Sequence, residues 1–384
     1  MKVNFSQRSE ERMKILRAVY DELGTQNEIS TVGVDDGFVL RSAQPQNSSM
    51  KCKMITINNI RDLKMVTGNP DELIEKGLIK YKKPAVSNLT DRNMRAENAM
   101  VGYDNSTMVC DVMSAYIYGN SSDVKENEDL LNKIYFPMEI ACFGSDNQDI
   151  IVEKGKTLLI DASSGTPIHA AFRKVTLEEG AQIKMLGNVD LSVDEINQNG
   201  SPSENGSIIS GGTHGGSGNN GGSGGNGANG SSGTGNSTSK SGRNGSDGAD
   251  GSDGMNGGDA KPVTVNLKKL TRPVTICSIG GNGGNGGNGG NGGKGGNGGN
   301  SGNGATITIY IESGADYLYM LDKSASGGNA GAGGNGGNGG NPGSPNGSGK
   351  IGSVGAAGKA GMAGTAGTAG IAGDIHVITP DNME

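Results

Sequence analysis

Glycine recurs at every third position over most of the second half of the chain. Three stretches keep this register, from Gly212 to Gly257, from Gly281 to Gly302 and from Gly328 to Gly373. Only three positions break it: Asn236, Ser239 and Asn346. A flexible linker needs glycine in quantity but not in phase, so a period of three indicates a helix with three residues per turn. That is the geometry of the polyproline or polyglycine II helix.

The composition of the second half leaves backbone hydrogen bonding as its main source of cohesion. The chain has 384 residues, of which 71 are Gly, and aromatic residues make up only 4%. A polyglycine II helix has no internal hydrogen bonds, and glycine loses more entropy on ordering than any other residue. We therefore expect such helices to pack side by side, so that each N–H and C=O finds a partner on a neighbour.

The number of glycine rows on a helix predicts how many of its sides are covered. Gly280–Gly299 has two Gly rows and one row of Asn or Lys, which suits an inner position with Asn facing water. Gly349–Gly373 has one Gly row beside Ala, Thr, Met, Ile and Lys, which suits an edge position with Ala and Ile resting on a β layer. Breaks at 236–241 and 342–346 read as turns. They divide the tracts into five segments, 211–235, 242–258, 280–304, 327–341 and 349–373.

Two other structures also accommodate glycine-rich tracts. A collagen triple helix needs Gly at every third residue, but Gly-Gly-Asn without proline is a poor collagen sequence. Tracts rich in Gly, Ser and Asn are usually disordered, but the strict three-residue register and the strands between the tracts argue against disorder here. Both alternatives stay open at this stage.

Residues 1–148 read as a mixed α/β globular domain. Apolar spacing predicts a helix over 6–23, and Asn69 with Pro70 predicts a second helix that ends at Gly77, with Asn as the cap. Short apolar runs predict strands at Met54–Ile57, Met108–Met113 and Tyr135–Cys142. Two polar clusters predict turns, at Asp35–Gly37 and Ser145–Asn147.

A β-rich segment with an internal repeat follows at 149–200. Val152–Ile160, Leu177–Met185 and Ile311–Tyr319 share the pattern apolar-Glu-x-Gly-x-polar followed by apolar-x-apolar. This pattern is typical of the rungs of a β-solenoid or of a meandering sheet, although Glu-x-Gly is also a common hairpin turn. Further strands are expected at Val263–Leu267, Val274–Ile279, Thr306–Ile311 and Ile375–Ile378.

The predicted fold is therefore an α/β unit, a solenoid-like or sheet layer, and a polyglycine II bundle. The bundle spans 201–384, with β-strands interspersed, so the C-terminal half is expected to be β and polyproline II rather than α. Glycine helices leave the β layer and return to it.

Side chains that could carry chemistry form no recognisable site. Three Asp at 247, 250 and 253 fall on one face of a three-fold helix, which suits an edge row better than calcium. His169, His214 and His376 stand alone, and no nucleophile–base pair is visible. We expect no enzyme activity, no cofactor and no metal.

The four cysteines lie far apart, without a CxxC motif. Cys52, Cys110, Cys142 and Cys277 read as isolated buried thiols rather than zinc ligands, and a disulfide among the first three stays open for an extracellular protein. The net charge of −7 without a basic patch argues against nucleic acid as a partner.

The N-terminus is polar and charged and lacks the apolar core of a signal peptide. No stretch approaches the roughly 18 apolar residues of a membrane span. We expect an extracellular or particle-associated protein that is exported without a classical signal peptide. A cytoplasmic location stays open.

The triplet tracts at 201–373 resemble two known groups of polyglycine II bundles. In the tail-tip adhesins of T-even-like phages, glycine-rich helices are joined by variable loops that bind bacterial surface receptors. In the glycine-rich antifreeze proteins of snow fleas, a similar bundle has a flat ice-binding face. The first 200 residues resemble neither group.

These features favour a non-enzymatic surface-recognition protein or adhesin. Turns on a rigid scaffold carry recognition, so the candidate contacts for a cell-surface glycan or protein receptor are Asn236, Ser237, Thr238, Ser239, Lys240, Pro342, Ser344, Pro345 and Asn346. A structural protein would instead form a homo-oligomer through the edge row of Gly349–Gly373. An ice-binding protein would use Thr365 and Thr368, and a toxin carried by the bundle is a further alternative.

Overall fold

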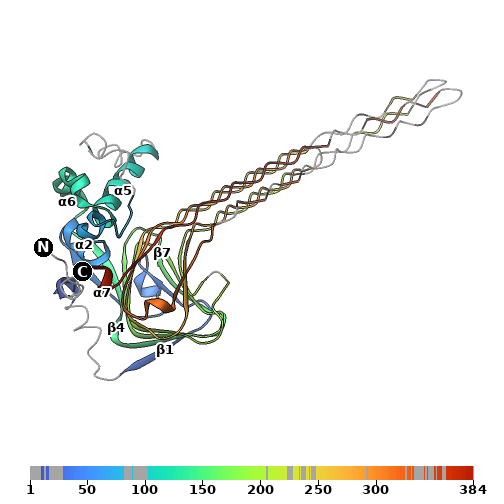
Figure 1. Cartoon of the computed structure of the whole chain (residues 1–384). Helices are drawn as coiled ribbons and strands as arrows, with labels where there is room; N and C mark the ends of the chain where they lie inside the picture. Colours follow the sequence, from blue (N-terminus) through green and yellow to red (C-terminus); the bar gives the residue numbers. More distant parts are fainter. Residues whose placement is uncertain are drawn as a thin grey trace.

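The structure is a computed structural model of the whole chain. It describes residues 10–12, 14–16, 29–81, 89, 103–204, 206–222, 228–232, 234, 239–241, 243, 248–290, 293–324, 327–329, 331–332, 341, 344, 350–351, 353–356 and 360–383. Two mostly parallel β-sheets and a small set of helices form the body, in an α/β arrangement (Figure 1). Glycine-rich loops extend together from the body as a long stalk (Figure 1).

From β4 onward, strands that follow one another along the chain alternate between the two sheets. Sheet A has eight strands: β1 (Ser30–Val34), β3 (Cys52–Ile57), β4 (Met138–Val152), β6 (Ile168–Leu177), β8 (Val189–Gln198), β10 (Val263–Leu270), β12 (Ile307–Ser313) and β14 (Ile375–Ile378). Sheet B has six: β2 (Val39–Arg41), β5 (Thr157–Ala162), β7 (Gln182–Gly187), β9 (Ile208–Gly211), β11 (Val274–Ile279) and β13 (Leu318–Leu321). All pairs are parallel except β3 with β4. The strands come from all three predicted parts of the chain.

The predicted Glu-x-Gly repeats form the corners between the sheets. Gly155, Gly180 and Gly314 have φ between 68° and 84°, a conformation that glycine adopts without steric cost. They connect β4 to β5, β6 to β7 and β12 to β13. The Gly155 amide donates to Glu179 O at 2.9 Å, which joins one corner to the next. The repeat therefore marks a turn between sheets and not a hairpin within one.

The main core lies between the two sheets. Alternate residues of each strand point inward, for example Val263, Val265 and Leu267 of β10, and their partners from sheet B include Val274 and Ile276. These side chains are at most 2% exposed. Burial of such side chains is the main driving force for folding of the body.

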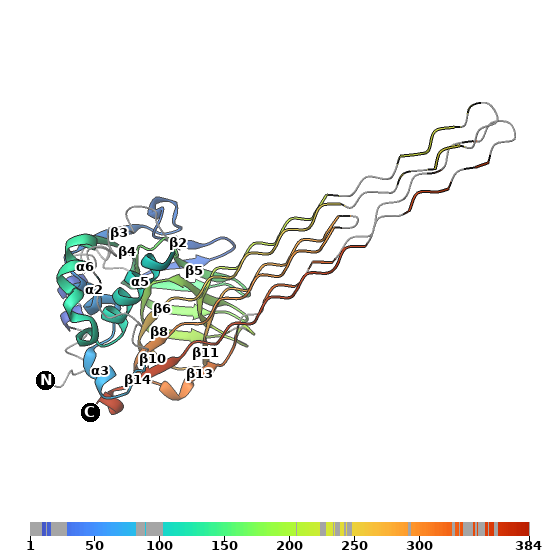
Figure 2. The same cartoon turned by 90° about the horizontal axis from the view of Figure 1, so that it is seen from above.

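Helices cover the outer face of sheet A (Figure 2). They are α2 (Ile60–Thr67), α3 (Asp71–Glu75), α5 (Tyr103–Tyr118), α6 (Glu128–Tyr135) and the short C-terminal α7 (Pro380–Met383), with 3-10 turns η1 (Pro45–Asn47), η2 (Ser121–Asn127) and η3 (Ala315–Tyr317). Thr264 Oγ1 on the outer face donates to Thr67 O of α2 at 2.7 Å. A second core forms there, between α2, α5, α6 and residues such as Ile140 and Cys142 of β4.

Several predictions for the first domain were wrong. Met108–Met113 is not a strand but part of α5, in which Val109, Val112 and Ala115 lie three residues apart and are buried on one side. The predicted strand from Tyr135 begins only at Met138, after a cis Phe136–Pro137 bond. Helices α2 and α6 were not predicted.

Other local predictions had mixed outcomes. The predicted turn at Ser145–Asn147 lies inside β4, where its pairing with β6 shifts register. Asn69 does not cap α3; its side chain donates to Tyr118 O at 3.0 Å. The turn at Asp35–Gly37 is confirmed, and of the helix predicted over 6–23 the described residues 10–12 and 14–16 are helical.

Candidate functional site

Three glycine loops leave the body between consecutive strands. The first (212–262) joins β9 to β10, the second (280–306) joins β11 to β12, and the third (322–374) joins β13 to β14. Each has an outgoing run and a return run, and the six runs lie side by side near the body (Figures 1 and 2). We call the three loops together the stalk.

Backbone hydrogen bonds join neighbouring runs at every third residue. In the first loop, the amides of Gly258, Met255 and Ser252 donate to Thr213, Gly216 and Asn219 at 2.8–2.9 Å, so the two runs are antiparallel. Between loops, outgoing runs are parallel: Gly215 and Gly218 donate to Asn282 and Asn285. The expected side-by-side packing is confirmed for these described runs.

The prediction that the glycine tracts form five segments was wrong for the second loop. The stretch 280–304 is not one 25-residue segment, because the chain reverses between Gly290 and Gly293. The amides of Gly293, Gly296, Gly299 and Gly302 donate to Gly290, Gly287, Gly284 and Gly281, at 2.7–2.9 Å. The second loop is therefore about half as long as the first, and beyond its reversal only the first and third loops continue. A sequence that repeats Gly-Gly-Asn without a break contains no signal for this reversal.

Glycine rows mark the faces where backbones touch, as predicted. On the second loop, a Cβ at Gly283 would lie 1.9 Å from Gly299 O, and a Cβ at Gly284 would lie 1.9 Å from Gly216 O. Both rows are thus covered, whereas on the return run of the third loop the covered row is the single one that includes Gly364 and Gly367. That run lies at the edge. Ile371 is 73% exposed, so the prediction that its side chain rests on the β layer was wrong.

Asn and Asp side chains have a role that was not predicted. They are exposed, as expected. Their Oδ1 atoms also accept a hydrogen bond from one backbone N–H per turn of the parallel neighbouring run. The pairs include Asn288 with Ala332, Asn297 with Thr365, Asn300 with Thr368, Asp250 with Lys294 and Asp253 with Asn297, at 2.6–3.0 Å. These hydrogen bonds account for Asp250 and Asp253 without a calcium ion. Asp247, the third residue of the acidic row, lies outside the described residues. Thr365 Oγ1 also donates to Asn297 at 2.9 Å.

Described residues next to the predicted recognition turns join the first loop to the third. The amide of Gly230 donates to Asn341 O at 2.7 Å, and that of Ser239 donates to Lys350 O at 3.0 Å. Ser239 is buried, whereas Lys240 and Ser344 are exposed. The other predicted contacts lie outside the described residues: Asn236, Ser237, Thr238, Pro342, Pro345 and Asn346.

A buried polar cluster lies on the outer face of sheet A. Asp190 is fully buried and binds Arg12, His169 Nδ1 at 2.6 Å and Asn266 Nδ2 at 2.9 Å. Arg12 also donates to Val66 O at 3.0 Å. Burial lowers the pKa of His169 below its ordinary value, despite the adjacent Asp190. The cluster ties the N-terminal helical residues to β6, β8 and α2.

The remaining single histidines and the cysteines are also accounted for by local contacts. His214 Nδ1 accepts from the Asn282 amide at 3.0 Å, and His376 Nε2 accepts from the Lys80 amide at 3.3 Å. None of the four cysteines forms a disulfide; Cys142 and Cys277 are buried as predicted, whereas Cys52 is half-buried and Cys110 is exposed, so the prediction of four buried thiols was wrong for these two. Burial raises the pKa of Cys52 to about 11, which keeps it a thiol.

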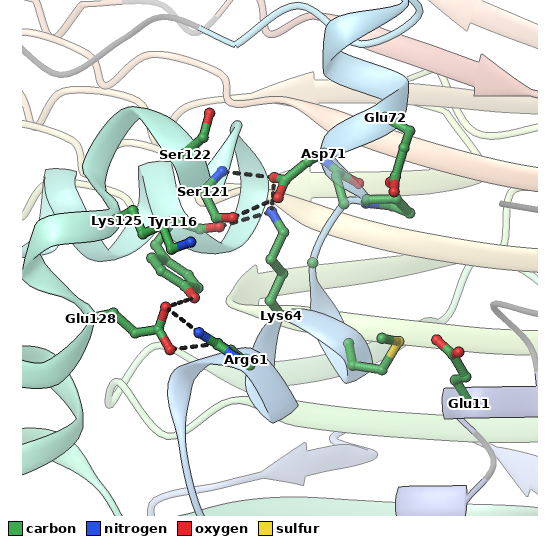
Figure 3. Close-up of a pocket in the computed structure, with 14 residues that line it drawn as sticks. Glu11, Arg61, Lys64, Asp71, Glu72, Tyr116, Ser121, Ser122, Lys125 and Glu128 are labelled. Carbon is green, nitrogen blue, oxygen red and sulfur yellow. Dashed lines mark hydrogen bonds and ion pairs between the residues drawn. The ribbon is translucent and has the colours of Figure 1, made fainter. Parts of the chain in front are cut away.

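A cavity of about 540 Å³ lies among α2, α3, α5 and η2 (Figure 3). Four of its charged groups form two pairs: Glu128 accepts from Arg61 Nε at 2.5 Å and from Tyr116 OH at 2.7 Å, and Asp71 pairs with Lys64 at 3.0 Å. Lys64 Nζ also donates to Tyr116 O and Gly119 O at 2.8 Å, near the end of α5. These bonds hold the helices together, so we read the cavity as part of the scaffold.

In the described part of the chain, no helix combines the length and apolar character needed to span a membrane. Comparison of the chain with protein-family models, with curated proteins and with solved structures found no match.

Proposed function

We propose that the glycine runs are polyglycine II helices and that the alternating strands form a β-solenoid. Hydrogen bonds between runs that recur at every third residue, together with glycine rows that recur at the same period and face the neighbouring backbones, support three residues per turn. Parallel strands that alternate between two sheets, with glycine corners, support a solenoid.

We propose that the protein is a non-enzymatic adhesin that binds a glycan or protein on a cell surface. The observation that carries this proposal is the pairing of the first and third loops beyond the reversal of the second, through Gly230 with Asn341 and Ser239 with Lys350. At a rise of about 3.1 Å per residue, the 24 residues from 212 to 235 extend for about 70 Å. A stalk of that length would hold two turns together and far from the body.

Exposed cations near this end indicate the kind of receptor. Lys240, Arg243 and Lys350 are exposed, and Lys350 is bonded through its carbonyl to the residue next to Lys240. We therefore infer an anionic receptor, such as an acidic polysaccharide or a phosphorylated surface glycan. Attraction between exposed charges weakens with added salt. Binding should accordingly weaken as the salt concentration rises.

The experiment that tests this function measures binding of the intact, labelled protein to whole cells and to an array of neutral and anionic glycans. The test variants replace 236–241, or 342–346, by Gly, Ser and Asn, and a third combines Lys240→Ala with Lys350→Ala. Met255→Ser is the control, because Met255 is 69% exposed on the stalk. Saturable binding that the variants lose and the control keeps is expected. Binding that survives all three changes would contradict the proposal.

A self-assembling structural protein is the second candidate, and one observation favours it. The edge run of the third loop exposes a continuous row that includes Ile351, Val354, Ala360, Ala363 and Ala366. Apolar side chains at the open edge of the array could pair with a second chain. Fibres that form with rising concentration, without any cell or glycan binding, would favour this role over the adhesin.

A further inference from the structure

The two sheets end unevenly at the C-terminal side of the body. From β4 onward, each earlier strand of sheet A is followed by a strand of sheet B, as β12 is followed by β13. Strand β14 is followed instead by helix α7, so sheet A has a strand beyond β12 while sheet B stops at β13. Within the described residues, β13 pairs with β11 and its other edge carries no strand.

This edge exposes side chains that belong to the core face of the sheet. Met320 is aligned with Ile276 of β11, which is fully buried in the core, yet Met320 is 57% exposed. Tyr319 on the same strand is 52% exposed. The end of sheet A differs, because Ile378 of β14 is fully buried with Leu73 and Ile79. Among the described residues, helices thus cover the last strand of sheet A, whereas the last strand of sheet B is left open at the same side of the body.

We propose that the open edge of β13 binds an extended segment of a partner protein, which adds a seventh strand to sheet B. Unpaired strand edges offer backbone donors and acceptors to an added strand, and alternate side chains set its specificity. The added strand would place apolar residues over Leu318 and Met320. Asp316 and Asp322 flank β13 and are both exposed, so a basic residue at the start of the segment fits this edge.

Charge favours a different protein over a second copy of this chain. If two β13 strands paired, the exposed carboxylates of Asp316 and Asp322, which flank the strand, would bring four negative charges to one contact. Like charges brought together by paired strands are destabilising. A partner segment with a basic residue has no such penalty.

The probe is a labelled synthetic peptide with the sequence of 272–279, in which serine replaces Cys277. Strand β11 already pairs with the other edge of β13, with Val274 beside Leu318 and Ile276 beside Met320. The same parallel register on the free edge would place Arg272 of the peptide near η3, which precedes β13 and contains Asp316. Fluorescence anisotropy then measures binding of this peptide, and of a scrambled peptide, to the intact protein.

We expect saturable binding of the peptide and none of the scrambled sequence. Met320→Lys and Asp316→Lys should each weaken binding at least tenfold, whereas Met255→Lys on the stalk should leave it unchanged; circular dichroism checks that all three fold. No saturable binding, or equal weakening by Met255→Lys, would overturn the proposal. So would a concentration-dependent dimer that Met320→Lys abolishes, because a second copy would then occupy the edge. Receptor binding by the stalk is a separate readout, and its failure would leave this result intact.

Discussion

The carbonyl oxygen of Gly293 lies 2.1 Å from the position that a Cβ atom on Gly289 would occupy. Real Cβ atoms do not approach an oxygen so closely, and the contact is with backbone, which cannot rotate away as a side chain can. The close packing of the two runs of the second loop therefore requires a residue without a Cβ atom at position 289. The same relation recurs at Gly286 with Gly296 and at Gly283 with Gly299.

Gly289→Val should destabilise the stalk far more than Asn288→Val. The first change forces two backbones apart and breaks the bond from the Gly289 amide to Ala332 O, so we expect a cost of more than about 2 kcal/mol. The second removes one exposed acceptor, worth about 1 kcal/mol. Thermal melting of the intact protein, followed by the polyproline II signal in circular dichroism, measures both. Equal shifts would remove the argument from backbone contact.

The asparagine row should protect specific amides from hydrogen exchange. Asn300→Ala removes the acceptor for the Thr368 amide, whose distance to Asn300 Oδ1 is 3.0 Å, so exchange at Thr368 should accelerate. Asn300→Asp is the matched control, because its carboxylate keeps an acceptor at the same place. The cost to stability should be about 1 kcal/mol for Ala and less for Asp. If both variants exchange alike at Thr368, the Asn side chain is not the acceptor in solution.

Local sequence rules predicted the parts of this fold that repeat. A glycine register of three residues predicted lateral packing, and Glu-x-Gly predicted turns such as the one at Gly155, because each depends on a backbone geometry that few residues other than glycine allow. The rules failed where neighbours far apart in sequence decide. Asn288 reads as a solvated residue until Ala332, 44 residues later, lies beside it.

The open edge of β13 and the buried polar cluster could not be predicted from the sequence either. Met320 reads as a core residue like its neighbour Ile276 on β11, and it is exposed because no strand among the described residues lies beyond β13. Arg12 and Asp190 are 178 residues apart and carry no motif, so their buried pair could not be predicted. Met108–Met113 looked like a strand because six residues are too few to separate a buried helix from a buried strand.

Acid should destabilise the body through His169. Burial lowers the pKa of this histidine below its ordinary 6.5, so below about pH 6.5 the unfolded chain binds a proton that the folded chain does not. The contribution of neutral His169 to the free energy of unfolding is therefore fully present above about pH 6.5 and is lost as the pH falls below it. The melting temperature should drop between pH 7 and pH 5, and His169→Gln should flatten that dependence. His376→Gln is the comparison, since its ring is only half-buried; a wild-type slope in His169→Gln would contradict this assignment.

Deleting three residues from a glycine run should be tolerated better than deleting one. Removal of 216–218 leaves every following residue on its original row, because three residues complete one turn. Removal of Ser217 alone moves Asn219 into the place of Gly218, where a Cβ lies 2.0 Å from Ser252 O. We expect the polyproline II signal of the triplet deletion to melt within a few degrees of the wild-type protein, and that of the single deletion to melt well below it. If the two deletions melt together, the runs do not have three residues per turn.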